Sequence, residues 1–129
     1  MEAGSGAGDR SAPEAHRFLV ESRPGAPGVV VLSLSGELDH DTAQPLQDAL
    51  EEHDTAGRVV VDCAGLRFCD STGLNVLLRA RLRLRDTGGH LDLAGLGPPV
   101  DRMFEITGAR TVFRVYDDVA DALADRRPG

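Results

Sequence analysis

Short valine-rich runs alternate with amphipathic stretches along this chain, and the alternation restricts the folds that it can form. Arg58-Val59-Val60-Val61-Asp62-Cys63 is an apolar run typical of a central strand covered on both faces. Val29 to Gly36 is a second β-branched run, and it ends in glycine. Because each run is followed by leucines at helical spacing, the pattern predicts right-handed crossovers and a mainly parallel sheet.

The other elements complete an α/β sandwich that begins with an antiparallel pair. A Pro/Gly cluster at residues 23–28 separates the first two strands, which predicts a hairpin. The expected order is ββαβαβαβα, with about five strands in a mixed, mostly parallel sheet and about four helices. We expect strands at 15–22, 29–36, 58–63, 90–95 and 111–115, and helices at 42–52, 71–86, 98–107 and 117–125.

Capping residues mark the expected ends of these helices. Asp41 or Thr42 can cap the first helix and Asp70 the second, because their side-chain oxygens accept hydrogen bonds from free backbone amides. Gly88 and Gly108 follow the second and third helices and permit the left-handed conformation that ends a helix. A proline pair opens the third helix, where the missing amide hydrogens have no partner to lose.

The length of 129 residues fits one domain. We assign residues 14–126 to it, with a flexible N-terminal tail at 1–13 and a flexible C-terminus at 127–129. The net charge of −7 makes nucleic acid and membranes poor partners and a basic protein surface a better one. Without a signal peptide or an apolar run of about 18–20 residues, the sequence predicts a cytoplasmic protein, as a monomer or a weak dimer.

The residue patterns of enzymes and metal sites do not occur in this sequence. Cys63 and Cys69 are too few for a disulfide framework and lack metal-ligand spacing, so we expect reduced, partly buried thiols. The histidines are scattered and match no catalytic or metal signature. We therefore expect no enzymatic activity, no catalytic residues, no metal and no cofactor. A thiol switch between the cysteines is an alternative that alkylation with and without oxidant would test.

Two segments are candidate functional sites. Ser35-Gly36-Glu37-Leu38-Asp39-His40 follows a strand, where Gly36 permits a bend and Asp39 projects at the end of the sheet. In the second, at residues 66–74, Asp70 caps a helix whose first turn holds Ser71 and Thr72. The positive end of that helix favours an anion, so a phosphate there would be tolerated. From chemistry alone, an ordinary turn and an ordinary helix cap remain open.

The second helix also carries a row of arginines. Their alternation with leucine predicts a solvated basic face, which could instead meet acidic groups of a partner or of the protein's own loops. The residues are Arg79, Arg81, Arg83 and Arg85.

Taken together, the motifs resemble those of bacterial anti-sigma-factor antagonists, which belong to the STAS-domain family. The resemblance rests on Gly36-Glu37-Leu38-Asp39, an apolar strand ending near Asp62, and Asp70-Ser71-Thr72-Gly73-Leu74 at a helix start. It continues through Gly88-Gly89 and the segment from Pro98 to Gly108, and covers roughly residues 15 to 125. The family implies a STAS-type fold and a regulatory protein without catalysis.

The resemblance further implies partner switching. The unphosphorylated antagonist binds an anti-sigma factor that is also a serine kinase of the histidine-kinase-like ATPase fold, and so frees a sigma factor for transcription, as in stress responses. The kinase phosphorylates the hydroxyl residue after the aspartate, here Ser71 with Thr72 as the alternative. A metal-dependent serine phosphatase reverses the step. The implied partner-binding residues are Asp39, Asp70, Ser71, Thr72 and Gly73.

Other roles fit the same resemblance. A STAS scaffold or ligand-binding module of a sensory complex would keep the fold and change the role. A domain of an anion transporter is a further alternative, and the lack of apolar spans in the sequence argues against it.

Overall fold

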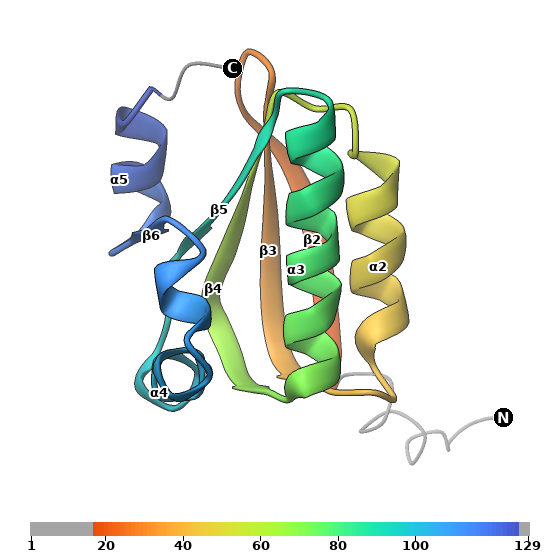
Figure 1. The fold of residues 1–129 in the computed structure, drawn as a ribbon, viewed down its shortest axis with the longest axis vertical. Helices are drawn as coiled ribbons and strands as arrows, with labels where there is room; N and C mark the ends of the chain where they lie inside the picture. Colours follow the sequence, from red (N-terminus) through yellow and green to blue (C-terminus); the bar gives the residue numbers. More distant parts are fainter. Residues whose placement is uncertain (1–16, 127–129) are drawn as a thin grey trace, which may run out of the picture.

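The computed structural model describes residues 17–126, so the expected tails at 1–13 and 127–129 lie outside the described residues, as do residues 15 and 16. Figure 1 shows the elements, in the order expected from the sequence. The strands are β2 (Phe18–Ala26), β3 (Val29–Leu38), β4 (Arg58–Cys69), β5 (His90–Ala94) and β6 (Val115–Tyr116). The helices are α2 (Ala43–Glu52), α3 (Ser71–Asp86), α4 (Pro98–Thr107), α5 (Val119–Ala124) and the 3₁₀ turn η2 (Ala109–Thr111).

The strands form one five-stranded sheet in the order β2-β3-β4-β5-β6. β2 pairs antiparallel with β3, and every other neighbouring pair is parallel. Parallel neighbours require crossover connections, which α2, α3 and α4 supply. The mixed, mostly parallel α/β fold predicted from the sequence is confirmed.

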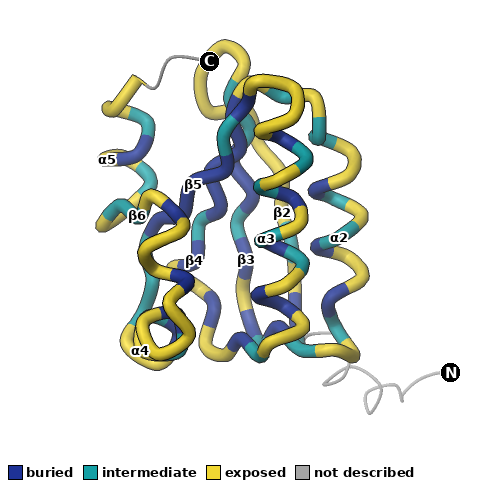
Figure 2. The backbone as a smooth tube through the Cα atoms, viewed as in Figure 1, coloured by how far each residue is buried: buried dark blue, intermediate teal, exposed yellow. Residues whose placement is uncertain are grey.

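Helices cover the two faces of the sheet unequally. α2, α3 and α4 pack on one face, where Leu46, Leu77 and Phe104 join the larger core. α5 covers part of the other face, where Ala122 packs against Val31. Successive strand residues point to opposite faces, so the central strands are apolar on both sides. Figure 2 shows the result: the inner strands β3, β4 and β5 are largely buried, while the edge strand β2 and the outer sides of the helices are exposed.

The turn expected at residues 23–28 is shorter in the structure. β2 continues to Ala26, and only Pro27 and Gly28 form the turn. Pro24 lies in register with Val30. A proline is tolerated there because β2 is an edge strand, whose outward amide needs no ladder partner.

The prediction of a loop after Cys63 is also wrong, because strand β4 continues to Cys69. Its register against β3 shifts between the pairs Ser33–Asp62 and Ser35–Gly65, where β4 gains an extra residue. The Asp62 carboxylate accepts a hydrogen bond from the Ala64 amide at 3.0 Å. The bulge interrupts the apolar alternation, which explains why the sequence pattern did not show this half of the strand.

The strand expected at residues 111–115 is only partly present. Residues 109–111 form η2, in which the Val112 amide donates to the Ala109 carbonyl at 2.9 Å. Pairing with β5 begins only at Val115, since Phe113 is buried against Phe104 with ring centroids 6.2 Å apart. Local hydrogen bonds and this aromatic contact outweigh the strand preference of β-branched residues.

Three of the predicted helix ends are confirmed. Gly88 and Gly108 have φ of 83° and 82°, in the left-handed region that ends α3 and α4. Asp70 caps α3 by accepting the Gly73 amide at 3.0 Å. Thr42 occupies the cap position of α2 but makes no side-chain capping bond.

A buried ion pair fixes α5 to the sheet. Nε of Arg58 donates to the Asp92 carboxylate at 2.7 Å, and the side chains are 6% and 0% exposed. Nη1 of Arg58 donates to the carbonyls of Ala122 and Asp125, near the end of α5, at 2.9 and 3.0 Å. The Tyr116 ring centroid lies 5.6 Å from the same guanidinium. One side chain of β4 thus binds β5 and the end of α5 together.

Candidate functional site

The two motifs singled out in the sequence meet at the carboxyl edge of the sheet. Asp39 follows β3, and Asp70 follows the neighbouring strand β4. Leu38 and Cys69, the last residues of these strands, are in register. The Asp70 amide donates to the Leu38 carbonyl at 3.0 Å. Segments that are far apart in the sequence therefore form one site, as expected where functional loops gather at strand ends.

Ser71 and Thr72 are exposed in the first turn of α3. Among residues 17–126, none makes a hydrogen bond to the Ser71 hydroxyl, so none of these residues is placed as the adjacent base that an activated nucleophile requires. The helix dipole places partial positive charge at this turn. The Asp70 carboxylate accepts a hydrogen bond from the Gly73 amide but not from the amides of Ser71 and Thr72. The geometry suits a hydroxyl that receives a phosphate.

Gly73 sets how closely α3 approaches the sheet. A Cβ at this position would lie 2.5 Å from Cγ of Leu38 and 3.1 Å from Sγ of Cys69. Any larger residue would push the start of the helix outward and move the neighbouring hydroxyls. The predicted site residue Gly73 is buried, so the structure places it behind the surface rather than on it.

Gly36 has a comparable role on β3. Its φ is 98°, in the left-handed region, and an added Cβ would overlap the backbone oxygen of Arg17. The glycine lets β2 lie close enough for the Glu37 amide to donate to that oxygen at 2.7 Å. The contact places Arg17 beside the loop that contains Asp39.

The Asp39 carboxylate binds other groups of the same chain. Oδ1 accepts hydrogen bonds from the amides of Asp41 and Thr42 at 2.9 and 3.1 Å. Oδ2 accepts from Arg17 at 2.6 Å, and the Arg17 and Asp39 side chains are 28% and 16% exposed. The sequence predicted Asp41 or Thr42 as the cap of α2, but Asp39 satisfies the amides that precede this helix.

These contacts change the acidity of Asp39. Desolvation raises the pKa of its carboxyl, but hydrogen bonds from Asp41 and Thr42 and the charge of Arg17 outweigh it, so the pKa lies below its ordinary value. The ionised form is therefore favoured by folding, and its contribution to stability is complete above the ordinary pKa and is lost as the pH falls through the lowered one.

We predict that Asp39→Ala lowers the free energy of unfolding by about 1 kcal/mol at neutral pH, because it removes the acceptor of the Asp41 and Thr42 amides. The difference from wild type should shrink as the pH falls below the ordinary carboxyl pKa of 3.8. Urea unfolding at several pH values measures it. Asp41→Ala, which removes a neighbouring exposed carboxylate, is the control and should change the free energy of unfolding little. If the difference between wild type and Asp39→Ala were the same at all pH values, the stabilising role of the ionised Asp39 would be contradicted.

An open depression of about 440 Å³ lies beside the phosphate-acceptor candidates. Two of its residues, Asn75 and Leu78, were not among the predicted site residues; Asn75 lies four residues after Ser71, and Leu78 three residues after Asn75. Phe68, near the end of β4, is 49% exposed. Helical spacing could have pointed to Asn75 and Leu78, whereas the exposure of Phe68 follows from the irregular register of β4.

The cysteines do not form a reactive site in this structure. Cys63 and Cys69 are free and buried. Desolvation, followed by the nearby charge of Asp70, raises the pKa of the Cys69 thiol to about 12. Desolvation also raises the pKa of Cys63. Because the thiolate is the reactive form, these environments argue against the alternative of a thiol switch.

Residues 17–126 hold no group of three or more side chains suited to bind a metal ion. None of the helices in that range has the length and apolar character needed to cross a bilayer.

Comparison with known proteins points to one family. A family model described as "Mlab, STAS domain" matches residues 22–115. The chain is 31% identical over 101 residues to the anti-sigma F factor antagonist of Paenibacillus polymyxa, and the match covers 76% of this chain and 86% of the relative. It is 30% identical over 104 residues to the anti-sigma-F factor antagonist RsfB of Mycobacterium tuberculosis, with 79% and 84% covered.

Solved structures agree with the sequence matches. An anti-sigma factor antagonist from Mycobacterium paratuberculosis has a TM-score of 0.75 and 29% identity, covering 83% of this chain and 92% of that chain. The Bacillus cell fate determinant SpoIIAA, in its phosphorylated form, has a TM-score of 0.67 and 19% identity, covering 82% and 97%. At 19% identity the second likeness shows the fold alone.

Proposed function

Because this chain belongs to the STAS-domain family, and its matched relatives are anti-sigma factor antagonists, we propose that it is an anti-sigma-factor antagonist switched off by phosphorylation of Ser71. Its partner in this proposal is an anti-sigma factor that is also a serine kinase of the histidine-kinase-like ATPase type. Unphosphorylated, the chain binds that kinase and frees a sigma factor; a serine phosphatase restores it. These encounters would take place in the cytoplasm.

The observation that carries the proposal is the setting of Ser71. Its hydroxyl is exposed at the start of α3, next to an open depression, and no base contacts it within residues 17–126. Such a hydroxyl is a substrate for another enzyme rather than a nucleophile of its own.

The electrostatics favour release after phosphorylation. A phosphate adds about −1.5 to −2 charges next to Asp70, whose carboxylate already caps the helix. Two like charges about 4 Å apart repel by about 4 kcal/mol at an effective dielectric of about 20. In an interface that accommodates the neutral hydroxyl, an added dianion also loses hydration, which weakens binding further. The helix dipole meanwhile keeps the phosphoprotein folded, so the switch needs no change of fold.

The choice between Ser71 and Thr72 is tested by labelling. The full chain is incubated with its cognate kinase and ATP, and the labelled peptide is sequenced by mass spectrometry. We expect wild type and Thr72→Ala to be labelled at Ser71, and Ser71→Ala to remain unlabelled. Labelling of Ser71→Ala at the wild-type rate would show that the assigned site is wrong.

A further inference from the structure

The edge of β5 is only half paired. On the side of β4, all residues from His90 to Ala94 have a partner, whereas on the side of β6 only Leu93 and Ala94 do. The Leu93 amide donates to the Arg114 carbonyl at 3.0 Å. Because alternate residues of a strand direct their backbone groups to the same edge, the N–H and C=O of Leu91 point to this edge without a strand partner.

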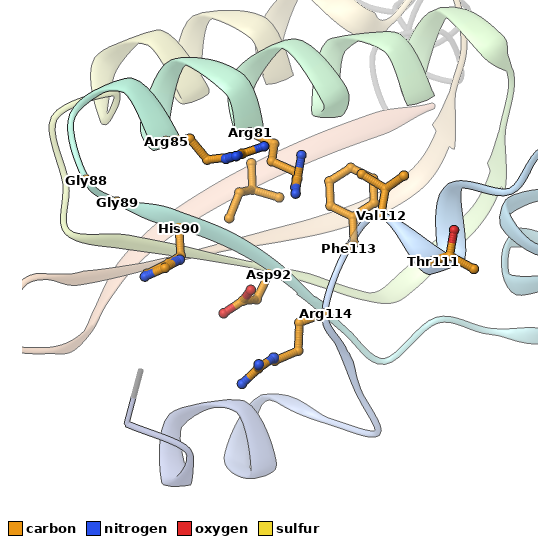
Figure 3. Close-up of a pocket in the computed structure, with 11 residues that line it drawn as sticks. Arg81, Arg85, Gly88, Gly89, His90, Asp92, Thr111, Val112, Phe113 and Arg114 are labelled. Atoms are coloured by element: carbon orange, nitrogen blue, oxygen red, sulfur yellow. The ribbon is translucent and has the colours of Figure 1, made fainter. Parts of the chain in front are cut away.

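A cavity of about 550 Å³ opens at this unpaired stretch. Figure 3 shows Arg81 and Arg85 on α3 above β5, with Val112 and Phe113 on another side of the opening. Val112 is 40% exposed, which adds an apolar surface to the rim. Figure 3 therefore shows an edge of the sheet flanked by cationic side chains.

The charges of Arg81 and Arg85 are not neutralised within the described chain, whereas Arg114, which also lines the cavity, pairs with Asp125. No carboxylate of residues 17–126 lies within ion-pair distance of Arg81 or Arg85. The dipole of α3 explains basic residues in its last turn, where Arg85 lies, but Arg81 comes a turn earlier. In a chain with a net charge of −7, a local group of unpaired arginines is a surface for an acidic partner.

We infer that the groove between α3, the Leu91 edge of β5 and Val112 binds an extended acidic segment of a protein partner, which adds a short strand to the sheet. The segment's backbone pairs with Leu91, and its carboxylates contact Arg81 and Arg85. The C=O of Leu91 decides against a small anion as the occupant, because a carbonyl repels an anion but accepts a hydrogen bond from a peptide amide.

The groove is separate from the phosphorylation site. Ser71 and Arg85 lie at opposite ends of α3, about 21 Å apart at 1.5 Å per residue. Docking here therefore stands independently of the proposed switch. A partner that used both ends of α3 would gain affinity from a second contact that phosphorylation does not touch.

The probe is an acetylated and amidated hexapeptide of alternating threonine and glutamate, titrated into the full chain and followed by amide NMR shifts. We expect the largest shifts at Leu91 and its neighbours in β5. The double substitution Arg81→Gln with Arg85→Gln should weaken binding at least about tenfold. The same peptide with glutamine in place of glutamate should bind the wild-type chain about as weakly as the acidic peptide binds the double variant.

Matched controls separate the possible outcomes. Arg67→Gln with Arg79→Gln removes the same charge from exposed positions outside the groove and should leave binding unchanged. Ser71→Glu should also leave it unchanged, so failure of either proposal is recognisable on its own. Equal weakening by both arginine pairs, or no binding at millimolar peptide, would contradict the groove. Shifts at Leu91 caused by inorganic phosphate alone would contradict the proposal and identify the occupant of the groove as an anion. Shifts caused by self-association of the chain would likewise contradict it and identify the occupant as a second copy.

Discussion

Ser71→Glu should weaken binding to the cognate anti-sigma kinase by about a hundredfold, while Ser71→Ala should bind as tightly as the unphosphorylated chain. A hundredfold loss corresponds to about 2.8 kcal/mol, which is less than the roughly 4 kcal/mol of repulsion between like charges about 4 Å apart. A carboxylate carries less charge than phosphoserine, so it reproduces part of the effect. Calorimetric titration of each variant with the kinase measures it.

The control for this prediction is a glutamate placed elsewhere. Ser22→Glu adds the same charge to an exposed serine of the edge strand β2, away from the start of α3. Its affinity for the kinase should stay within a few-fold of wild type. Equal weakening by both substitutions would mean that net charge controls the affinity, and the specific role of Ser71 would have to be abandoned.

Asp92→Ala should destabilise the domain by about 3–5 kcal/mol, a large share of the 5–15 kcal/mol that typically stabilises a native domain. The substitution leaves the Arg58 guanidinium, which is 6% exposed, without its carboxylate partner. The cost arises from a buried charge without compensation rather than from the loss of one hydrogen bond. Urea unfolding should show a lower midpoint with little change in slope.

An exposed contact between a carboxylate and a histidine provides the comparison. Asp41 lies 3.3 Å from Nε2 of His40, and the side chains are 62% and 73% exposed. Asp41→Ala should therefore change stability by less than about 1 kcal/mol. If Asp92→Ala were as mild as Asp41→Ala, the buried pair would not be what holds α5 on the sheet.

The elements that the sequence predicted best are those with local chemical signals. Gly88 and Gly108 end their helices because glycine tolerates positive φ, and Asp70 starts α3 because its carboxylate accepts the Gly73 amide. The far half of β4 and the shortened β6 were predicted poorly. Their form depends on a bulge and on the contact of Phe113 with Phe104, which are set by tertiary packing.

In the candidate site, too, the features with local signals were predictable from the sequence, whereas those set by tertiary packing were not. Ser71 and Thr72 could be placed on the first turn of a helix from sequence alone, and the structure puts them there. The pairing of Asp39 with Arg17 could not be predicted, because it joins β2 to the end of β3 through the close contact at Gly36. The proposed partner-binding role of Asp39 therefore acts through the shape of the loop, since its carboxylate is occupied internally.

We propose that a phosphate on Ser71 separates this chain from its kinase without unfolding it. The most direct test is calorimetric titration of the cognate anti-sigma kinase with the unphosphorylated chain and with the chain phosphorylated at Ser71, whose amide NMR spectra are compared alongside. We expect an affinity at least about a hundredfold lower for the phosphoprotein, with spectral changes confined to the first turn of α3 and its neighbours. Equal affinities of the two forms would contradict it.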